Sequence, residues 1–121
     1  METNKRILVI DDNELLLSAL KNLLEYDGFQ VETCPHAVPA LALAEEHPFD
    51  IYVIDYRLPG INGDAITVVI RRMQPTAIII GSSAESKEQA FLRAGADTFI
   101  AKQELPVELL AFMRQTLGAH C

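Results

Sequence analysis

The chain alternates short apolar runs with amphipathic stretches along its whole length, and this alternation constrains its fold more than any other feature. The apolar runs predict strands at residues 6–10, 29–34, 51–54, 77–81 and 97–101. The segments that follow them predict helices at 13–27, 36–47, 62–74, 85–94 and 105–117. This order predicts an α/β fold, a doubly wound five-stranded parallel sheet flanked by five helices.

The apolar runs also indicate how the sheet is covered. Residues 7–10 and 77–80 are apolar at every position, as in parallel strands that are buried on both faces. With a strand order of 2-1-3-4-5, the first and third strands are neighbours, and the crevice at their carboxyl ends is where such folds bind ligands. The length of 121 residues, without repeat or linker, predicts a single domain over 1–121.

Composition and charge exclude several classes of function. The formal net charge of −7 argues against direct binding to nucleic acid or anionic membranes, because both need a basic face. No run approaches the ~20 apolar residues of a membrane span, and no leader pattern precedes the first strand, so we expect a cytoplasmic protein. Cys34 and Cys121 have no metal-ligand spacing and are expected to stay reduced. Arg71 and Arg72 are predicted to lie at a helix C-terminus, where positive charge is favourable.

Acidic residues follow the first and third predicted strands. Asp11 and Asp12 come after one strand and Asp55 closes the other, so we expect the three carboxylates to converge at one sheet edge. Two like charges ~4 Å apart repel by ~4 kcal/mol at an effective dielectric constant of ~20. The cluster therefore needs protonation or a cation, and its oxygen ligands suit Mg²⁺. Taken singly, these residues also have an ordinary structural explanation. Asp12 or Asn13 could serve simply as the N-cap of a helix, and Asp55 could simply begin a turn.

The ends of the fourth and fifth predicted strands carry Ser82, Ser83 and Lys102. A hydroxyl and an ammonium there could donate to an oxyanion bound at the acidic cluster. The alternatives are a surface lysine and serines that cap a helix ahead of Glu85. The order along the chain, an acidic pair, an acid, a hydroxyl and a lysine, each at a strand end, favours a functional site.

This ordered set resembles the receiver domain of two-component response regulators, the CheY-like family with its flavodoxin-like strand order, over essentially the whole chain. The matching segments are 11–12, 55–63, 82–84 and 95–102. The resemblance implies that Asp55 accepts a phosphoryl group from a phosphohistidine on a partner histidine kinase or histidine phosphotransfer protein. It further implies one Mg²⁺ ion, with Asp12 as a direct ligand and Asp11 acting mainly through water. Asp55 and the backbone carbonyl of Arg57 would complete the protein's ligands, and Lys102 would pair with the phosphoryl oxygens.

The resemblance also implies a conformational switch. Phe99 matches the aromatic position that turns inward when a serine hydroxyl moves to the phosphoryl group. Ser83 fits the usual distance from Asp55 and the usual following alanine, whereas Ser82 fits the usual distance to Lys102. We favour Ser83, with Ser82 as the alternative.

Three departures from the family pattern affect the site. Gln103 stands where proline is usual, and a non-proline cis peptide costs about 3 kcal/mol, so we expect a trans bond and a differently shaped loop. The interval from Asp55 to Lys102 is short, which predicts a clipped fourth helix. The cation Arg57 lies two residues past Asp55, and we hypothesise that it reaches the phosphoryl group or shields it from water.

The leading prediction is a phosphorylatable receiver that switches its partner surface and is not a turnover enzyme. The family implies an output domain or a downstream protein, and homodimers through the fourth helix, fifth strand and fifth helix. The first alternative is a pseudo-receiver that binds protein independently of phosphorylation. The second is a Mg²⁺ phosphohydrolase that works through an aspartyl phosphate.

The first predicted helix carries more leucines than one face can bury. The expected sheet-facing stripe contains Leu16, Leu20, Leu23 and Leu24, with Leu17 at its border. Leu15 falls outside the stripe. It is either an ordinary exposed leucine or part of a docking patch for a helix of another protein, and the sequence favours neither.

Overall fold

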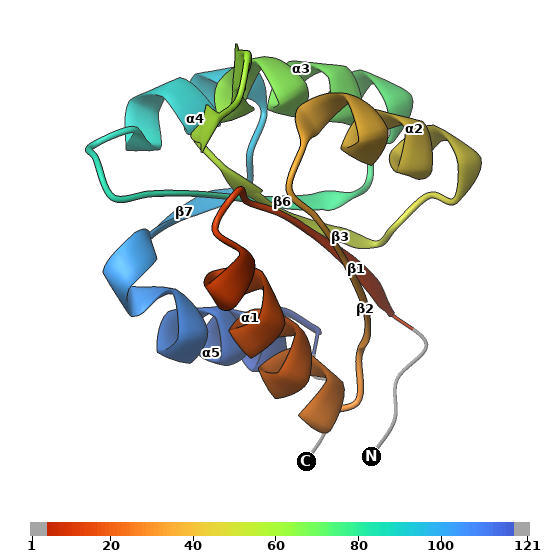
Figure 1. Ribbon diagram of the computed structural model, residues 1–121, viewed down its shortest axis with the longest axis vertical. Helices are drawn as coiled ribbons and strands as arrows, with labels where there is room; N and C mark the ends of the chain where they lie inside the picture. The colour runs from red at the N-terminus through yellow and green to blue at the C-terminus, as the bar shows by residue number, and fades with distance from the viewer. Residues whose placement is uncertain (1–4, 118–121) are drawn as a thin grey trace.

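The structure, a computed structural model, describes residues 5–117, which fold into a parallel sheet with helices on both faces (Figure 1). The main strands are β1 (Arg6–Ile10), β2 (Gln30–Cys34), β3 (Ile51–Asp55), β6 (Ile78–Ser83) and β7 (Thr98–Ala101). The helices are α1 (Glu14–Tyr26), α2 (Ala37–Glu46), α3 (Gly63–Met73), α4 (Glu88–Ala94) and α5 (Leu105–Leu117). All four strand pairings are parallel, and the order β2-β1-β3-β6-β7 confirms the predicted order.

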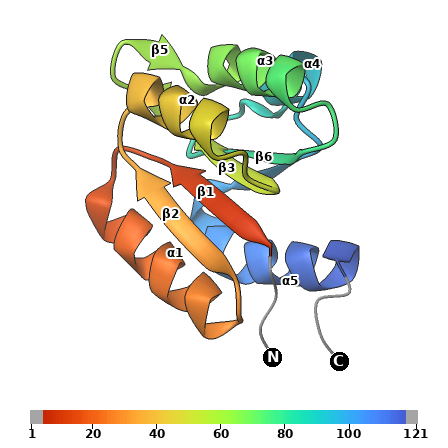
Figure 2. The same ribbon diagram turned by 90° about the vertical axis from the view of Figure 1, so that its right-hand side faces the viewer.

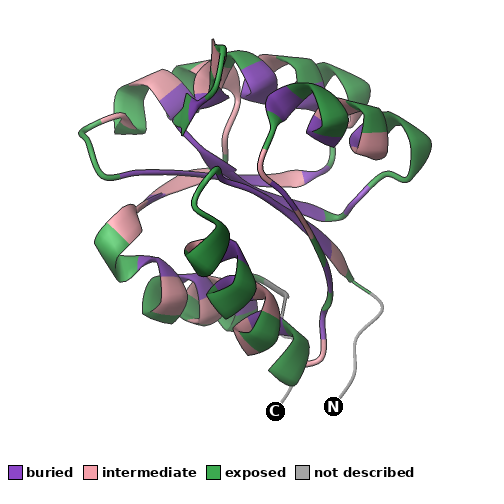
Figure 3. Ribbon diagram, viewed as in Figure 1, coloured by how far each residue is buried: buried purple, intermediate pink, exposed green. Residues whose placement is uncertain are grey.

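The two faces of the sheet bury two separate apolar clusters. Helices α1 and α5 cover one face, and α2, α3 and α4 cover the other (Figures 1 and 2). Alternate residues of a strand enter opposite clusters: Val53 packs under α1 and α5, whereas Ile54 packs under the other three helices. Full burial of such a side chain contributes about 1.5–3 kcal/mol. The strands are buried through the middle of the molecule (Figure 3), which confirms a sheet covered on both sides.

Helix α1 is rotated slightly from its predicted orientation. Its buried residues are Leu17, Leu20 and Leu24. Leu17, predicted at the border, lies inside the stripe, and Leu16 is half-buried but packs against the same cluster as predicted. The prediction was wrong for Leu23, which is only half-buried. Consecutive leucines are equally apolar, so packing against the sheet chooses among them. Leu15 is 85% exposed, as its place outside the stripe predicted.

Three segments differ from the predicted boundaries. Strand β6 continues to Ser83, so both serines lie inside the strand. Helix α4 has seven residues and begins at Glu88, which confirms a short fourth helix but starts later than predicted. A two-stranded antiparallel hairpin that was not predicted, β4 (Arg57–Leu58) and β5 (Ile61–Asn62), follows β3. Its strands are too short to show an alternating pattern.

A short 3₁₀ helix, η1 (Lys102–Glu104), leads from β7 directly into α5. Every peptide bond among the described residues is trans, as predicted for Gln103. Lys102 therefore lies at the junction of the last strand and this turn, at the carboxyl edge of the sheet.

Arg71 at the end of α3 ties the short helix α4 and β7 to the rest of the molecule. Its guanidinium donates hydrogen bonds to the backbone carbonyls of Gly95 (3.0 Å), Pro75 (3.0 Å) and Ala77 (2.6 Å). It also pairs with Asp97 at 2.9 Å. The predicted position of Arg71 and Arg72 at a helix C-terminus is confirmed. In addition, Arg71 links the end of α3 to the end of α4 and to the residues just before β6 and β7.

No helix among residues 5–117 is long and apolar enough to cross a bilayer. Cys34 in β2 is a buried free thiol, and Cys121 lies outside the described residues.

Candidate functional site

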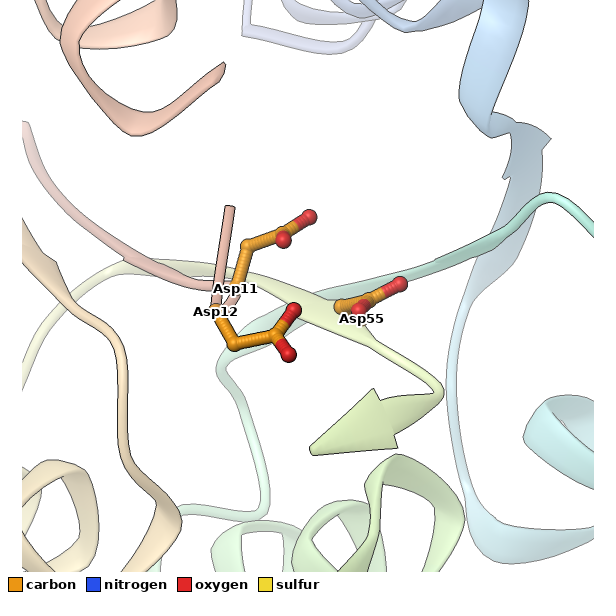
Figure 4. A group of neighbouring side chains, drawn as sticks. All are labelled: Asp11, Asp12 and Asp55. Carbon is orange, nitrogen blue, oxygen red and sulfur yellow. The ribbon is translucent and has the colours of Figure 1, made fainter. Parts of the chain in front are cut away.

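Three carboxylates converge at the carboxyl edge of the sheet. Asp11 and Asp12 follow the end of β1, Asp55 is the last residue of β3, and the three side chains lie next to one another at this edge (Figure 4). One oxygen of each lies within 4.8 Å of one oxygen of each other residue. Asp11 and Asp55 are 3% and 4% exposed, whereas Asp12 faces solvent. The predicted convergence is confirmed, and buried carboxylates this close need a neutralising partner.

Local structure leaves Asp12 without a structural task. Asn13 is the N-cap of α1, because its side-chain oxygen accepts a hydrogen bond from the N–H of Leu16 at 3.1 Å. Asp11 accepts a hydrogen bond from the N–H of Asn13 at 2.9 Å, which orients its carboxylate. The capping alternative therefore holds for Asn13 and does not account for Asp12.

The backbone around Asp55 is fixed by the start of α3. The N–H of Gly63 donates to the carbonyl of Tyr56 at 2.7 Å. A Cβ on residue 63 would overlap the carbonyl oxygen of Asp55, so only glycine permits this close approach. The loop that follows β3 thus returns across the strand end and holds Asp55 in place.

Lys102 lies between the two buried carboxylates. Its Nζ is 3.1 Å from Asp11 Oδ2 and 3.4 Å from Asp55 Oδ1. Partial burial alone would lower the pKa of Lys102, but the charges of Asp11 and Asp55 and hydrogen bonds to both outweigh burial and raise it. Lys102 is therefore a charged member of the site, and the surface-lysine alternative is wrong.

The site also shifts the titration of Asp55. Burial, the largest cause, and the nearby charge of Asp11 together raise the pKa of Asp55 to about 6, although the charge and hydrogen bond of Lys102 oppose them. At neutral pH the carboxylate is mostly ionised, and it lies in a crevice that disfavours its charge. A nearby cation, or a covalent change at the carboxylate, would therefore stabilise this buried charge.

The two serines of β6 point to opposite faces of the sheet and make different hydrogen bonds. Ser82 donates its hydroxyl to the carbonyl of Ile100 at 2.8 Å. The Ser83 oxygen accepts a hydrogen bond from the N–H of Glu85 at 2.9 Å. Both are almost fully buried, and helix α4 begins only at Glu88, so neither serine caps it.

Aromatic rings connect the site to α4 and β7. Tyr56, the residue after Asp55, meets Phe91 edge to face with centroids 6.0 Å apart, and Phe91 lies 6.0 Å from Phe99 in turn. Phe91 is fully buried, whereas Phe99 is half-buried. The sequence indicated Phe99 but missed Tyr56 and Phe91, since isolated aromatic residues in strands and helices usually belong to the core.

Arg57 is paired with a residue from a different loop. Its guanidinium makes two hydrogen bonds to Glu85, at 2.9 and 3.1 Å, which link β4 to the loop that follows β6. The hydrogen bond from Arg57 lowers the pKa of Glu85. The sequence did not indicate this partner. The role of the Arg57 backbone carbonyl as a metal ligand stays a prediction.

A parallel sheet of this order, with acidic residues and a lysine at its carboxyl edge, defines a doubly wound α/β protein whose crevice suits a cation and an oxyanion. Comparison with known families makes the assignment specific. The model of the response regulator receiver domain matches residues 7–114, and this chain belongs to that family.

Relatives agree with the family assignment. The transcriptional regulatory protein PrrA of Mycobacterium tuberculosis is 31% identical over 118 residues, which cover 95% of this chain and 51% of PrrA. The response regulator MprA of a Mycobacterium species is 32% identical over 115 residues, 93% of this chain and 50% of MprA. The chain thus spans about half the length of the curated relatives it matches.

Two solved structures of receiver proteins have the same fold. The CheY-like receiver domain protein of Methanospirillum hungatei has a TM-score of 0.89 and 30% identity, covering 96% of this chain and 95% of that one. A response regulator of Burkholderia pseudomallei has a TM-score of 0.84 and 27% identity, covering 96% of this chain and 72% of that one. The latter structure contains a phosphorylated aspartic acid, a calcium ion and citrate.

Proposed function

We propose that this chain is a phosphoacceptor module that takes a phosphoryl group on Asp55 and reports it through its surface. The observation that carries the proposal is the position of Lys102, whose ammonium contacts both Asp11 and Asp55 beside the three-carboxylate cluster. The phosphorylated aspartic acid in the Burkholderia pseudomallei relative supports the same chemistry at this kind of site.

In the proposed reaction, a carboxylate oxygen of Asp55 attacks phosphorus in line with the leaving group. A new P–O bond forms, and the bond from phosphorus to the donor breaks, which is the P–N bond of a phosphohistidine or the P–O bond of acetyl phosphate. The electron pair of that bond leaves with the donor. Lys102 stays charged and offsets negative charge on the phosphoryl oxygens. The product is an acyl phosphate on Asp55.

The residues of the cluster fit a Mg²⁺ ion. All three offer carboxylate oxygens within reach of one another, and Asp12 is open to solvent, as suits an ion that keeps several waters. Asp11, Asp12 and Asp55 would hold the ion, with the Arg57 carbonyl as the further ligand implied by the family. When bound, Mg²⁺ supplies positive charge against the equatorial phosphoryl oxygens.

The response would pass through β6 and β7. Ser83 lies on the sheet face that carries Phe91 and Phe99, whereas Ser82 has its hydroxyl committed to Ile100. We therefore assign Ser83 as the hydroxyl that moves to the phosphoryl group and Phe99 as the ring that follows it. The acyl phosphate carries about two negative charges, one more than the ionised carboxylate, and this charge gives the movement its driving force.

The partners follow from the same chemistry. The donor would be a histidine kinase or a histidine phosphotransfer protein, and the exposed Leu15 at the start of α1 is a candidate contact for it. The recipient of the signal would be an output domain or a downstream protein. Since the protein's own residues assist one transfer to itself, we propose that it is not a turnover enzyme.

One experiment tests the proposal against its alternatives. The protein is incubated with Mg²⁺ and acetyl phosphate, and the intact mass is measured for wild type, Asp55→Asn and the control Asp64→Asn, which alters an acid at the start of α3 outside the cluster. A phosphoadduct in wild type and Asp64→Asn that is lost in Asp55→Asn supports the receiver. Absence of an adduct at every Mg²⁺ concentration favours the pseudo-receiver. Turnover of varied phosphomonoesters favours the phosphohydrolase.

A further inference from the structure

The adjacent serines of β6 belong to different sides of the sheet. Ser82 lies two residues after Ile80, which packs under α1 and α5, whereas Ser83 lies two residues after Gly81, which contacts Phe91 of α4. Because side chains alternate along a strand, Ser82 lies on the α1 and α5 side. It is also the register partner of Asp55 in β3, and partners in parallel strands point to the same side.

The Ser82 hydroxyl links β6 to β7 near the carboxyl ends of the two strands. It is 1% exposed and donates to the carbonyl of Ile100, its own register partner in β7, at 2.8 Å. Strand β7 is an edge strand of the sheet, since its pairing within the described residues is with β6 alone. Backbone hydrogen bonds to β6 hold β7 on one side only, and the hydrogen bond from the Ser82 hydroxyl adds to them.

Lys102 follows Ile100 by two residues, at the point where β7 ends and η1 begins. Its ammonium contacts both Asp11 and Asp55. The position of this ammonium depends on the backbone of Lys102, and therefore on the contacts that hold the end of β7. The bond to the Ile100 carbonyl is a side-chain contact that fixes this end from β6.

We propose that Ser82 is a positioning residue for phosphorylation of Asp55, acting through Lys102. This inference rests on the proposed phosphoacceptor function and gives the two serines different roles. Ser82 holds the end of β7 so that Lys102 meets the phosphoryl oxygens, and Ser83 supplies the hydroxyl that moves. The proton of Ser82 is already donated to Ile100, whereas the Ser83 oxygen acts as an acceptor toward Glu85 and keeps its own proton to donate.

A double-mutant cycle tests this assignment. The rate constant of phosphorylation by acetyl phosphate is measured with saturating Mg²⁺ for wild type, Ser82→Ala, Lys102→Met and the double variant. We expect Ser82→Ala to slow phosphorylation about tenfold, because small misplacements of a charged group at a reacting centre are costly. In the Lys102→Met background, Ser82→Ala should change the rate less than twofold, since the group it positions is gone.

Three further measurements separate positioning from a general loss of structure. The Mg²⁺ affinity of Ser82→Ala should stay within twofold of wild type, because Asp11, Asp12 and Asp55 are intact. Ser82→Thr keeps the hydroxyl and should restore most of the rate. Ser83→Ala is the matched control, and it should slow the reaction equally with and without Lys102. If Ser82→Ala fails to fold, Ser82→Cys, a weaker donor of similar size, takes its place in the cycle.

Two results would overturn the inference while leaving the proposed function in place. One is a Ser82→Ala rate within twofold of wild type. The other is a tenfold loss that persists undiminished in the Lys102→Met background, which would show that Ser82 does not act through Lys102. If wild type itself forms no phosphoadduct, the proposed function fails, and this inference falls with it.

Discussion

The ring of Phe91 in α4 lies on Gly81 in β6, in the space that a Cβ at residue 81 would need. This contact seats the seven-residue helix on the sheet. Replacing Gly81 with alanine must displace the ring, and overpacking of this kind costs about 1–3 kcal/mol. We predict a loss of that size for Gly81→Ala in urea unfolding. The double variant Gly81→Ala/Phe91→Leu should lose less than the two single losses combined, and strict additivity would contradict the contact.

Arg71 is predicted to be a main stabiliser of the α3–α4 region. Removing its guanidinium leaves the carbonyls of Gly95 and Ala77 without their charged donor, so we expect Arg71→Ala to cost about 2–4 kcal/mol in unfolding free energy. Arg72→Ala is the matched control, because Arg72 is exposed, and it should change stability by no more than about 0.5 kcal/mol. Equal effects of the two variants would refute this role of Arg71.

The stability of the metal-free protein should depend on pH through Asp55. Its folded-state pKa of about 6 exceeds the ordinary value of ~3.9, so the folded protein binds this proton more tightly than the unfolded chain does. Ionised Asp55 therefore weakens the fold above pH 6, and this effect fades as pH falls from 6 toward 4. Asp55→Asn should raise the unfolding free energy at pH 8 by at most about 3 kcal/mol, at ~1.4 kcal/mol per pH unit of displacement.

The same unfolding series at pH 4 is the internal control for Asp55→Asn. There the wild-type carboxyl is mostly protonated in the folded state, and the two proteins should differ little. A difference that is equal at pH 4 and pH 8 would mean that the substitution acts through something other than charge. Added Mg²⁺ should stabilise wild type at pH 8 more than it stabilises Asp55→Asn.

The Arg57–Glu85 pair is predicted to govern how long phosphorylated Asp55 survives. Both side chains are well exposed, and exposed ion pairs are weak, so Arg57 can leave Glu85 for a phosphoryl group nearby. We expect faster dephosphorylation in Arg57→Ala, where the shield is lost, and slower dephosphorylation in Glu85→Ala, where Arg57 is released. The half-life of the adduct, followed by intact mass after removal of acetyl phosphate, measures both. An unchanged rate in Arg57→Ala would remove the hypothesis.

The apolar runs predicted the strands, and the strand order of the doubly wound family then placed Asp11, Asp12 and Asp55 at one sheet edge, as the structure has them. The sequence could not give the pairing of Arg57 with Glu85 or the contacts of Arg71, since each depends on where two distant loops meet. The sequence also could not say which serine lies on which face of the sheet, because that depends on the register of β6 against β3.

The rotation of α1 shows a different limit of sequence reasoning. Leu15, Leu16 and Leu17 are equally apolar, so hydrophobicity alone does not say which of them meets the sheet. The packed structure buries Leu17 and leaves Leu15 exposed. The docking role of Leu15 stays a prediction, and its exposure is compatible with both interpretations.

The most direct test of the central claim is to locate the phosphoryl group in the chain. After incubation with Mg²⁺ and acetyl phosphate, borohydride reduction converts an aspartyl phosphate to homoserine, and peptide mass spectrometry reads the position. We predict homoserine at residue 55 and none at Asp11 or Asp12. Homoserine at another aspartate, or none anywhere in a protein that has gained a phosphoryl group, would contradict the assignment of Asp55.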